Sequence, residues 1–293
     1  MRKKTMLHTI KNDCLTVTVD TFGAQMMSVK SADGYEYMWQ GEKWWEDRCP
    51  VLFPTCGNCP TRKYYYGGKE YKLPIHGIAM YKEFTLKSRS EDTLLFILKS
   101  DEKTLAQYPF DFEFKVEFKI SGSELTVKLM PKNTGDKVMP YMVGWHPGFN
   151  LWGDDDIGEF SVDFGKGDEL DWYPIPPNAP ISKYSRKHAL NGGKYFLNEE
   201  EIYANDTMIF ENYSKSFSLK DGKGYAKISM EVSDNLPFFC IWKEPYSEAR
   251  FVCLEPWSNI FNSDGTTEHF EKKEMQRLEP GCCGLYTYKV KFN

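Results

Sequence analysis

The sequence predicts an all-β fold, a large antiparallel β-sandwich or barrel with only a few short helices. Apolar and polar residues alternate over many short segments, and turn residues separate these segments. Almost no segment has the periodicity of an amphipathic helix, so crossover helices are not expected. Aromatic residues make up 16% of the chain, and such side chains favour strands.

The strands are expected in the following order along the chain. Residues 15–20 (LTVTVD) alternate, and so do residues 112–120, where Phe112, Phe114, Val116, Phe118 and Ile120 share one face. A turn at 121–123 leads into residues 124–130, which predicts a hairpin. A second hairpin is predicted for residues 216–232, with Asp221-Gly222 in its turn. Further strands are expected at 160–164, 238–242, 251–255 and 285–292, and short helices at 42–47 and 197–203.

The domain organisation follows from the segment between these strands. Residues 166–195 are rich in Pro, Gly and Asn, and we interpret them as a long excursion between strands. Because strand-like alternation of the same kind resumes afterwards, this segment is not a linker between domains. The length of 293 residues is compatible with one large β domain. We therefore expect a single domain over residues 1–293.

Charge and hydropathy exclude several classes of partner. The formal net charge is −5 and the Lys and Arg residues are scattered, so nucleic acids and membrane surfaces are not expected partners. The N-terminus lacks the apolar segment of a signal peptide, and the longest apolar runs, 94–98 and 238–242, are too short to span a bilayer. The eight cysteines are expected to be reduced thiols of a cytoplasmic protein. Whether the protein is a monomer or a homodimer stays open.

Three ionisable residues lie at the ends of strand-like segments: His76 in LPIHGIAM, His146 in VGWHPGFN and Glu255 in FVCLEPWSN. Pro147 and Pro256 directly follow two of them and restrict the backbone conformation there. Neighbouring aromatic side chains would exclude water from these positions. Such surroundings shift a pKa and fix a side chain in place, which are the two requirements of acid–base catalysis.

Each of these residues also has a purely structural interpretation. A histidine before Gly or Pro is more often a hydrogen-bonding loop residue, and a Glu at a strand end more often caps the strand or points into solvent. Trp145 and Trp257, which flank the ionisable residues, could simply fill the core. An aromatic face beside acid–base groups is nevertheless what sugar recognition uses, because the C–H face of a pyranose stacks on a ring.

The cysteines support a competing hypothesis of a metal or redox site. Cys56 and Cys59 have the C-x-x-C spacing, and Cys282-Cys283 could complete a zinc site. Adjacent cysteines are poor ligands for one tetrahedral metal ion, and the chain has no second C-x-x-C. The motifs of nucleotide and dinucleotide sites are also absent from the sequence. We therefore expect neither a metal nor a cofactor.

Six segments carry a resemblance to a known family. They are VLFPTCGN (51–58), YYYGGKEYKLPIHGIAM (64–80), YPFDFEFKVEF (108–118), MPYMVGWHPGFN (139–150), NDTMIFEN (205–212) and FVCLEPWSN (251–259). In this order, they make the chain resemble the aldose 1-epimerase (galactose mutarotase-like) superfamily, and most closely its LacX-like branch. The resemblance extends from about residue 8 to the C-terminus.

The resemblance implies an antiparallel β-supersandwich with a sugar cleft, and a cofactor-free interconversion of the α and β anomers of a hexose. By the same resemblance, Glu255 is the general base for the C1 hydroxyl and His146 is the general acid for the ring oxygen. His76 corresponds to a second histidine near that oxygen, Asp206 to a substrate-binding aspartate, and Trp257 completes the pocket. We expect His146 and Glu255 to converge on opposite sides of one bound pyranose.

One segment departs from the family pattern. The family often has an arginine soon after a glycine before the first histidine, but Asn58 follows the glycine here and the nearest arginine is Arg62. Either Arg62 or Asn58 takes this place. Two alternatives to the mutarotase therefore stay open: a non-catalytic carbohydrate-binding or sugar-sensing protein, and a hexose-phosphate epimerase. For the latter, Arg62, Lys63 and Lys243 are the only basic candidates.

Overall fold

The computed structural model describes residues 6–59, 62–165, 167–175, 180–205, 207–244, 248–262 and 269–293. Within these residues the chain forms 24 strands, and every pairing between them is antiparallel. The predicted all-β antiparallel fold is therefore confirmed. In the described part of the chain, no helix combines the length and the apolar character needed to cross a membrane.

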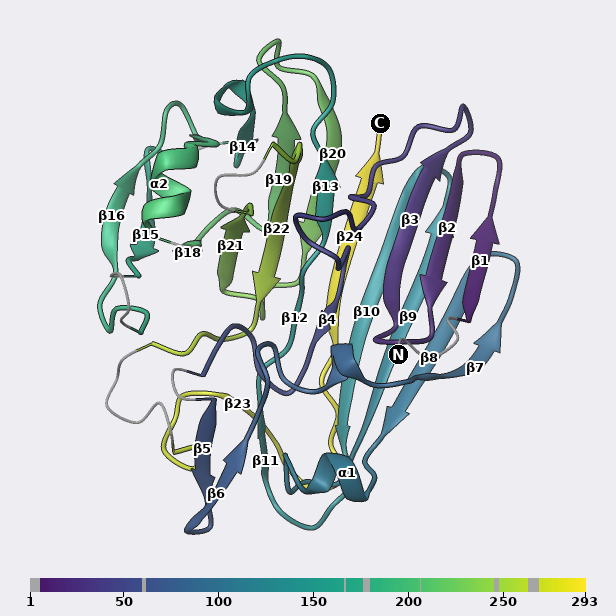
Figure 1. The fold of residues 1–293 in the computed structure, drawn as a ribbon, viewed down its shortest axis with the longest axis vertical. Coiled ribbons are helices and arrows are strands. Elements are labelled where there is room, and N and C mark those ends of the chain that lie inside the picture. Colours follow the sequence, from purple (N-terminus) through teal and green to yellow (C-terminus); the bar gives the residue numbers. More distant parts are fainter. Residues whose placement is uncertain are drawn as a thin grey trace.

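Two large sheets form the body of the molecule (Figure 1). The nine-stranded sheet has the order β17-β14-β19-β20-β24-β10-β9-β8-β7. Its strands are β7 (Thr85–Arg89), β8 (Thr93–Lys99), β9 (Phe112–Ser121), β10 (Glu124–Asn133), β14 (Ser161–Asp163), β17 (Lys194–Phe196), β19 (Ser216–Lys220), β20 (Ala226–Val232) and β24 (Tyr286–Phe292).

The eight-stranded sheet has the order β16-β15-β18-β21-β22-β12-β4, and β13 also pairs with β22. Its strands are β4 (Val51–Leu52), β12 (Gly144–Trp145), β13 (Gly148–Asn150), β15 (Glu169–Tyr173), β16 (Arg186–Ala189), β18 (Met208–Glu211), β21 (Phe238–Trp242) and β22 (Phe251–Trp257). This sheet carries the candidate active site.

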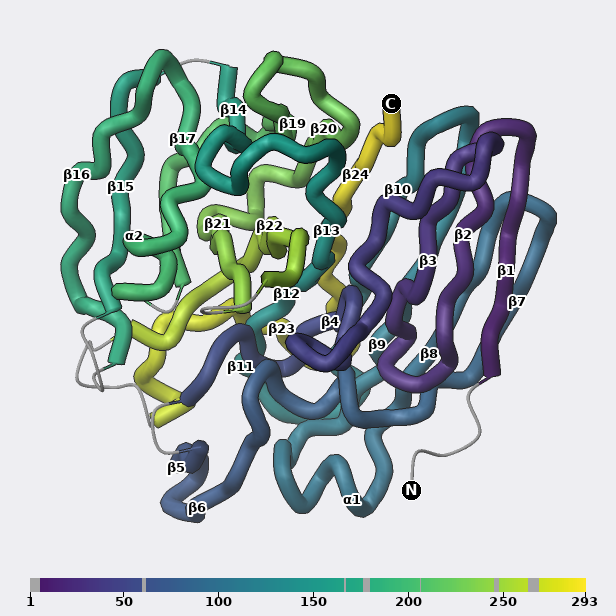
Figure 2. Tube along the Cα trace, turned by 45° about the horizontal axis from the view of Figure 1, so that its top comes forward, coloured from purple at the N-terminus to yellow at the C-terminus, as the bar shows by residue number. Residues whose placement is uncertain are grey.

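Smaller elements surround the two large sheets. The three-stranded sheet of β1–β3 lies beside β7–β9 in both views (Figures 1 and 2). The bounds of the smaller strands are β1 (Leu7–Lys11), β2 (Leu15–Asp20), β3 (Gln25–Ser31), β5 (Lys63–Tyr66), β6 (Lys69–Lys72), β11 (Met139–Tyr141) and β23 (Gln276–Leu278). The helices are α1 (Glu102–Leu105) and α2 (Glu199–Ala204), together with single 3-10 turns at Ala79–Tyr81 and Ile157–Glu159.

Alternating side chains place the core between the two large sheets. On β9, all five apolar residues of the predicted face, from Phe112 to Ile120, are buried, and β9 pairs with β10 as a hairpin. The eight-stranded sheet contributes Phe239, whose ring centroid lies 4.6 Å from that of Phe217 on the opposite sheet. Trp145 of the eight-stranded sheet likewise contacts Tyr288 of the nine-stranded sheet, with ring centroids 5.4 Å apart. Full burial of each such side chain contributes about 1.5–3 kcal/mol.

One buried apolar cluster runs from Ile10 to Phe292 and includes residues of all five sheets. This continuity supports the proposal that residues 1–293 form a single domain. The predicted hairpin at 216–232 is confirmed by the pairing of β19 with β20, and the predicted helix at 197–203 by α2. The side chain of Asn198 caps α2 by accepting the backbone N–H of Glu201 at 3.1 Å.

Two predictions about secondary structure are wrong. Residues 42–47 form a turn and not a helix, because Trp45 makes a tertiary contact: its ring stacks on that of His146 with centroids 5.0 Å apart. The segment 166–195 is not a strand-free excursion, since β15, β16 and the start of β17 lie in it. β15 and β16 continue the large sheet to its edge, where polar residues and interrupting turns are tolerated.

Candidate active site

Strand register places His146 opposite Glu255. Gly144 pairs with Trp257 and Gly148 pairs with Cys253, so His146, midway between the glycines, faces Glu255, midway between Cys253 and Trp257. Pro147 interrupts the ladder between β12 and β13 and leaves His146 in that gap. Directly opposed residues of antiparallel strands project their side chains on the same face of the sheet. Two residues far apart in the sequence thereby become neighbours.

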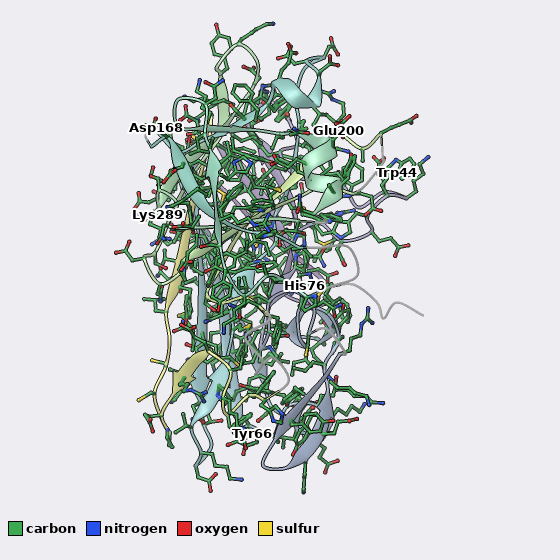
Figure 3. The ribbon with its side chains drawn as sticks, turned by 90° about the vertical axis from the view of Figure 1, so that its left-hand side faces the viewer. Trp44, Tyr66, His76, Asp168, Glu200 and Lys289 are labelled. Atoms are coloured by element: carbon green, nitrogen blue, oxygen red, sulfur yellow. The ribbon has the colours of Figure 1, made fainter. Side chains whose placement is uncertain are left out.

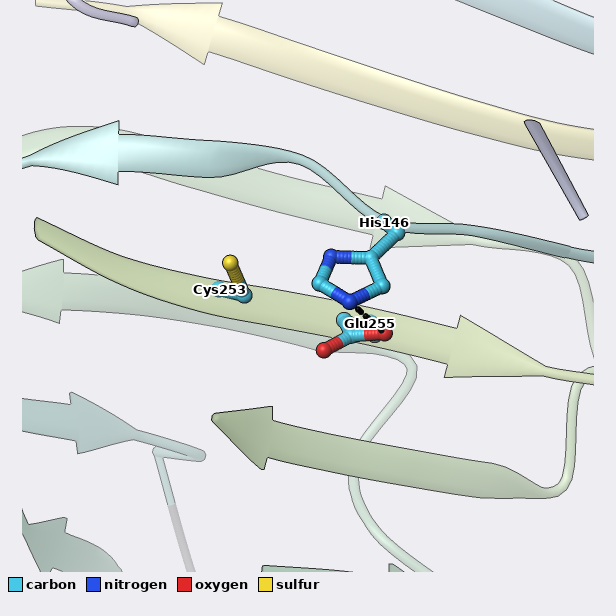
Figure 4. A group of neighbouring side chains, drawn as sticks. All are labelled: His146, Cys253 and Glu255. Atoms are coloured by element: carbon cyan, nitrogen blue, oxygen red, sulfur yellow. Dashed lines mark ion pairs between the residues drawn. The ribbon is translucent and has the colours of Figure 1, made fainter. Parts of the chain in front are cut away.

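The two side chains lie in direct contact (Figure 4). His146 Nε2 is 3.3 Å from Glu255 Oε2, and the two side chains are only 8% and 1% exposed. This arrangement corrects the expectation of groups on opposite sides of a pyranose. The acid and base candidates are adjacent, as suits two oxygens bonded to the same carbon.

His76 approaches the pair from a tight turn before the 3-10 turn at Ala79–Tyr81. Its Nδ1 accepts the backbone N–H of Gly57 at 3.1 Å, so the proton of the neutral ring is on Nε2, which is a donor. Its ring centroid is 5.2 Å from that of His146. His76 itself has a φ of 61°, and a Cβ on Gly77 would come within 2.5 Å of the Phe53 carbonyl oxygen. Position 77 therefore requires glycine, because the backbone there passes very close to the backbone of Phe53.

Aromatic rings enclose the histidines. Trp45 stacks on His146 with ring centroids 5.0 Å apart and an interplanar angle of 29°, and Trp242 meets the same imidazole edge-on at 5.8 Å. Trp257 lies 5.9 Å from His76. These contacts fix the orientation of the imidazoles and exclude water from them.

The glycines on either side of His146 make room for these indoles. A Cβ on Gly144 would lie 2.5 Å from Trp257 Cδ1 and 3.0 Å from Cys56 Sγ, and a Cβ on Gly148 would lie 2.7 Å from Trp45 Cζ3. The contacts of 2.5 and 2.7 Å are too short for a side chain at either position. The two glycines of GWHPG are therefore needed for close packing on both sides of the imidazole.

We expect Gly144→Ala to lower the free energy of unfolding by about 1–3 kcal/mol, because the methyl group overpacks the contact with Trp257. Gly158→Ala is a matched control, since its added Cβ would meet only the Leu197 carbonyl oxygen at 3.9 Å. Urea denaturation of both variants measures the difference. Equal stability of the two variants would contradict the packing argument.

Burial shifts the pKa values of all three ionisable side chains. It raises the pKa of the Glu255 carboxyl well above its usual value, although the indole N–H of Trp257 acts in the opposite direction. Burial lowers the pKa of His146 well below its usual value, and the nearby His76 adds to this shift. Burial alone lowers the pKa of His76 to about 4, so this ring is neutral at pH 7.

A cavity of about 710 Å³ opens in front of this group. His76, His146, Glu255, Trp45, Trp242 and Trp257 all line it. Its polar walls include Asp47, Asn58, Thr207 and Glu244, and its apolar walls include Ile75, Ile181 and Phe261. In the edge-on view, His76 and Trp44 lie toward one side of the molecule and Lys289 of the nine-stranded sheet toward the other (Figure 3). The volume is in the range of small-molecule sites.

The remaining predicted site residues are placed differently. Trp257 lines the cavity, and Asp206 lies outside the described residues, next to Thr207. Arg62 is exposed and is not among the described lining residues, and its backbone carbonyl oxygen accepts the N–H of Leu73 at 3.0 Å. Asn58 lines the cavity in its place.

Sequence reasoning missed several residues of this site, among them Trp45, Trp242 and Cys253. Trp45 was expected in a helix and Trp242 at the end of a core strand, and neither segment signals a cavity. Within the described residues, only His146, Cys253 and Glu255 form a group that could hold a metal ion, with ligand atoms within 4.8 Å of one another. The C-x-x-C pair is not part of such a group, and the Cys59 thiol donates to the carbonyl oxygen of Lys63 at 3.0 Å.

Comparisons with known proteins find similar sequences and similar solved structures. Protein LacX of Lactococcus lactis subsp. lactis (plasmid) is 28% identical over 271 residues, covering 87% of this chain and 88% of the relative. The X-ray structure of a galactose mutarotase related enzyme from Lactobacillus acidophilus matches with a TM-score of 0.89 and 30% identity, covering 98% of this chain and 97% of the other.

A galactose mutarotase-like protein from Lactobacillus casei ATCC 334 has the same fold, with a TM-score of 0.88 and 22% identity over 98% of this chain and 100% of the other. The family model described as aldose 1-epimerase matches residues 6–281. This match includes the two histidines, the buried carboxylate and the strands that bring them together. The chain therefore belongs to the aldose 1-epimerase family.

Proposed function

We propose that the protein is a mutarotase that interconverts the α and β anomers of an unphosphorylated aldohexose by general acid–base catalysis, without a cofactor. The observation that carries this proposal is the contact of His146 Nε2 with Glu255 Oε2 at 3.3 Å inside the cavity. An acid and a base this close together match the hydroxyl oxygen O1 and the ring oxygen O5, which are both bonded to C1.

The proposed reaction moves two protons in each direction. Glu255 takes the proton from O1 while His146 gives a proton to O5, and the C1–O5 bond breaks to leave an open aldehyde. After rotation about C1–C2, the two transfers reverse and the ring closes on the other face. The pair ends with the same number of protons as at the start, so no net proton is consumed.

The assignment of Glu255 as base and His146 as acid follows the family resemblance, while burial disfavours the charged form of both groups. Burial raises the pKa of the Glu255 carboxyl and lowers the pKa of the His146 imidazole, so the two adjacent groups together hold one proton that either of them can pass to the sugar. His76 remains neutral at pH 7 and, through its Nε2–H, is proposed to donate a hydrogen bond at the ring-oxygen side of the sugar. Trp257 is proposed as a wall of the sugar pocket. The substrate-binding role of Asp206 depends on the family resemblance alone.

The charge of the cavity favours an uncharged sugar over a sugar phosphate. Its described lining includes Asp47 and Glu244 besides Glu255, but no Lys or Arg. Among the residues that the structure does not describe, only residues 1–5 and 166 include a Lys or an Arg. Of the basic candidates, Lys63 pairs with Glu70 and Lys243 pairs with Glu199. A phosphate group would therefore meet carboxylates without a compensating cation.

Polarimetry tests the proposal. We expect catalytic amounts of the protein to accelerate the loss of optical rotation of freshly dissolved α-D-glucose or α-D-galactose, and to act at least about tenfold less well on glucose 6-phosphate, since burying an unpaired charge is costly. The non-catalytic alternative predicts sugar binding in calorimetry without any acceleration. Failure to exceed the spontaneous rate on any aldose would refute the mutarotase.

A further inference from the structure

A third side chain adjoins the acid–base pair and has no part in the proposed reaction. Cys253 lies two residues before Glu255 on β22, so both side chains project on the same face of the strand. Its direct partner on β13 is Gly148, which has no side chain to separate the thiol from His146. The Cys253 sulfur, a His146 ring nitrogen and a Glu255 oxygen all lie within 4.8 Å of one another (Figure 4).

The chemistry of these atoms is that of a zinc site. Zn²⁺ prefers sulfur, imidazole nitrogen and carboxylate oxygen as ligands, in a tetrahedron with bonds of about 2.0–2.3 Å. Such a tetrahedron separates its ligand atoms by about 3.3–3.8 Å. The separation of 3.3 Å between His146 and Glu255 already fits, and the remaining contacts need to shorten by only about 1 Å. His146 and Glu255 line the cavity, from which water can reach the site.

Two buried polar atoms of the same group are also unsatisfied. Within the described residues, Glu255 Oε2 and His146 Nδ1 make no hydrogen bond, although both side chains are at least nine-tenths buried. Buried polar atoms without a partner are unusual, and such an atom often marks the place of a ligand. Glu255 Oε2 lies 3.3 Å from His146 Nε2, and a cation held by both side chains would satisfy this oxygen.

We propose that Cys253, His146 and Glu255 form a binding site for a soft divalent cation, with Zn²⁺ as the natural instance, and that this cation inhibits the enzyme by occupying its acid–base pair. As the S–Zn bond forms, the Cys253 thiol releases its proton to solvent. The bound ion then occupies both the imidazole and the carboxylate that handle the protons of the sugar. The inhibitory part of this proposal rests on the proposed function, whereas metal binding itself does not.

The alternative is that Cys253 only packs. Its side chain belongs to a small buried cluster with Trp39, Ala249 and Phe251, where a neutral thiol behaves as an apolar group. In that case, replacing it would change stability but would leave metal binding unaffected. The experiment therefore needs a direct spectroscopic signal from a bond between sulfur and metal.

Co²⁺ provides that signal, because its bond to a thiolate gives a charge-transfer band in the near ultraviolet. The three exposed thiols are first removed by the replacements Cys14→Ser, Cys282→Ser and Cys283→Ser, so that only buried cysteines remain. In this background we expect one equivalent of Co²⁺ to produce the band. Adding Cys253→Ala should abolish it, whereas adding Cys240→Ala should retain it.

Cys240 is a matched control because it is buried and faces Glu255 from β21, but it is not in the ligand group. In parallel, Zn²⁺ should inhibit mutarotation, and the half-inhibiting concentration should rise at least about tenfold in Cys253→Ala through loss of one zinc ligand. Rates are compared with each variant's own metal-free rate. Absence of the Co²⁺ band in the starting background, or its persistence in Cys253→Ala, would overturn the proposal. If the protein showed no mutarotation, the spectra would still decide whether the metal site exists.

Discussion

Replacing Glu255 by Gln is expected to reduce kcat for mutarotation by about 10²–10⁴-fold, the usual contribution of one general base. Gln has the shape of Glu but cannot accept the proton of the C1 hydroxyl. The loss corresponds to about 3–5 kcal/mol of transition-state stabilisation, at 1.36 kcal/mol for each factor of ten. Polarimetry under saturating sugar measures kcat, and the substrate dependence of the rate separates it from KM.

This loss is expected without a loss of stability. Glu255 is 1% exposed, and burial disfavours its charged form, so a neutral amide of the same shape fits the site. Glu244→Gln is the matched control, since that carboxylate lines the same cavity but is not paired with His146. A smaller effect of Glu255→Gln than of Glu244→Gln on kcat would remove Glu255 from the role of base.

The fold was predictable because its strands are amphipathic. The alternation on β9 and the turn before β10 predict a hairpin from local sequence alone, and the structure confirms it. Local reasoning failed where tertiary contacts decide the backbone. Trp45 packs against His146, some 100 residues away in the sequence, and this contact competes with the helix that its own segment predicts.

The candidate site was predictable at the level of residue types, but its geometry was not. His76, His146, Glu255 and Trp257 were identified from their motifs, and the structure brings all four to one cavity. The direct opposition of His146 and Glu255 depends on how β12 and β13 pair with β22, which no local pattern reveals. This is why the two groups were expected on opposite sides of the sugar.

The position of Cys253 shows the same limit. On a strand, the residue two positions before Glu255 must share its face, which the sequence alone predicts. Whether that face is the core or the cavity depends on the partner strands. Burial by itself does not distinguish a ligand cysteine from a packing cysteine, since Cys240 is as buried as Cys253 yet lies outside the ligand group. The consequence for metal binding therefore emerged only with the structure.

His146→Gln is the second variant expected to lose about 10²–10⁴-fold in kcat, because an amide cannot deliver a proton to the ring oxygen. Gln is chosen because its amide nitrogen can take the place of Nε2, the imidazole atom that lies 3.3 Å from Glu255. His188→Gln is the control, since His188 is paired with Glu201 at 2.7 Å and is not a lining residue of the cavity. It should leave kcat within about twofold of the wild type, as expected for a side chain without a role in proton transfer.

The double variant Glu255→Gln/His146→Gln makes the test sharper. Each transfer in the proposed reaction needs the other, because O1 cannot lose its proton productively unless O5 gains one. Residues that act as one unit are strongly non-additive, so removing both should cost about as much as the worse single replacement. If the two losses multiplied instead, each residue would act in a separate step, and the coupled proton transfer between O1 and O5 would be wrong. The comparison needs only the kcat values of the wild type, the two single variants and the double variant, measured on one sugar by polarimetry.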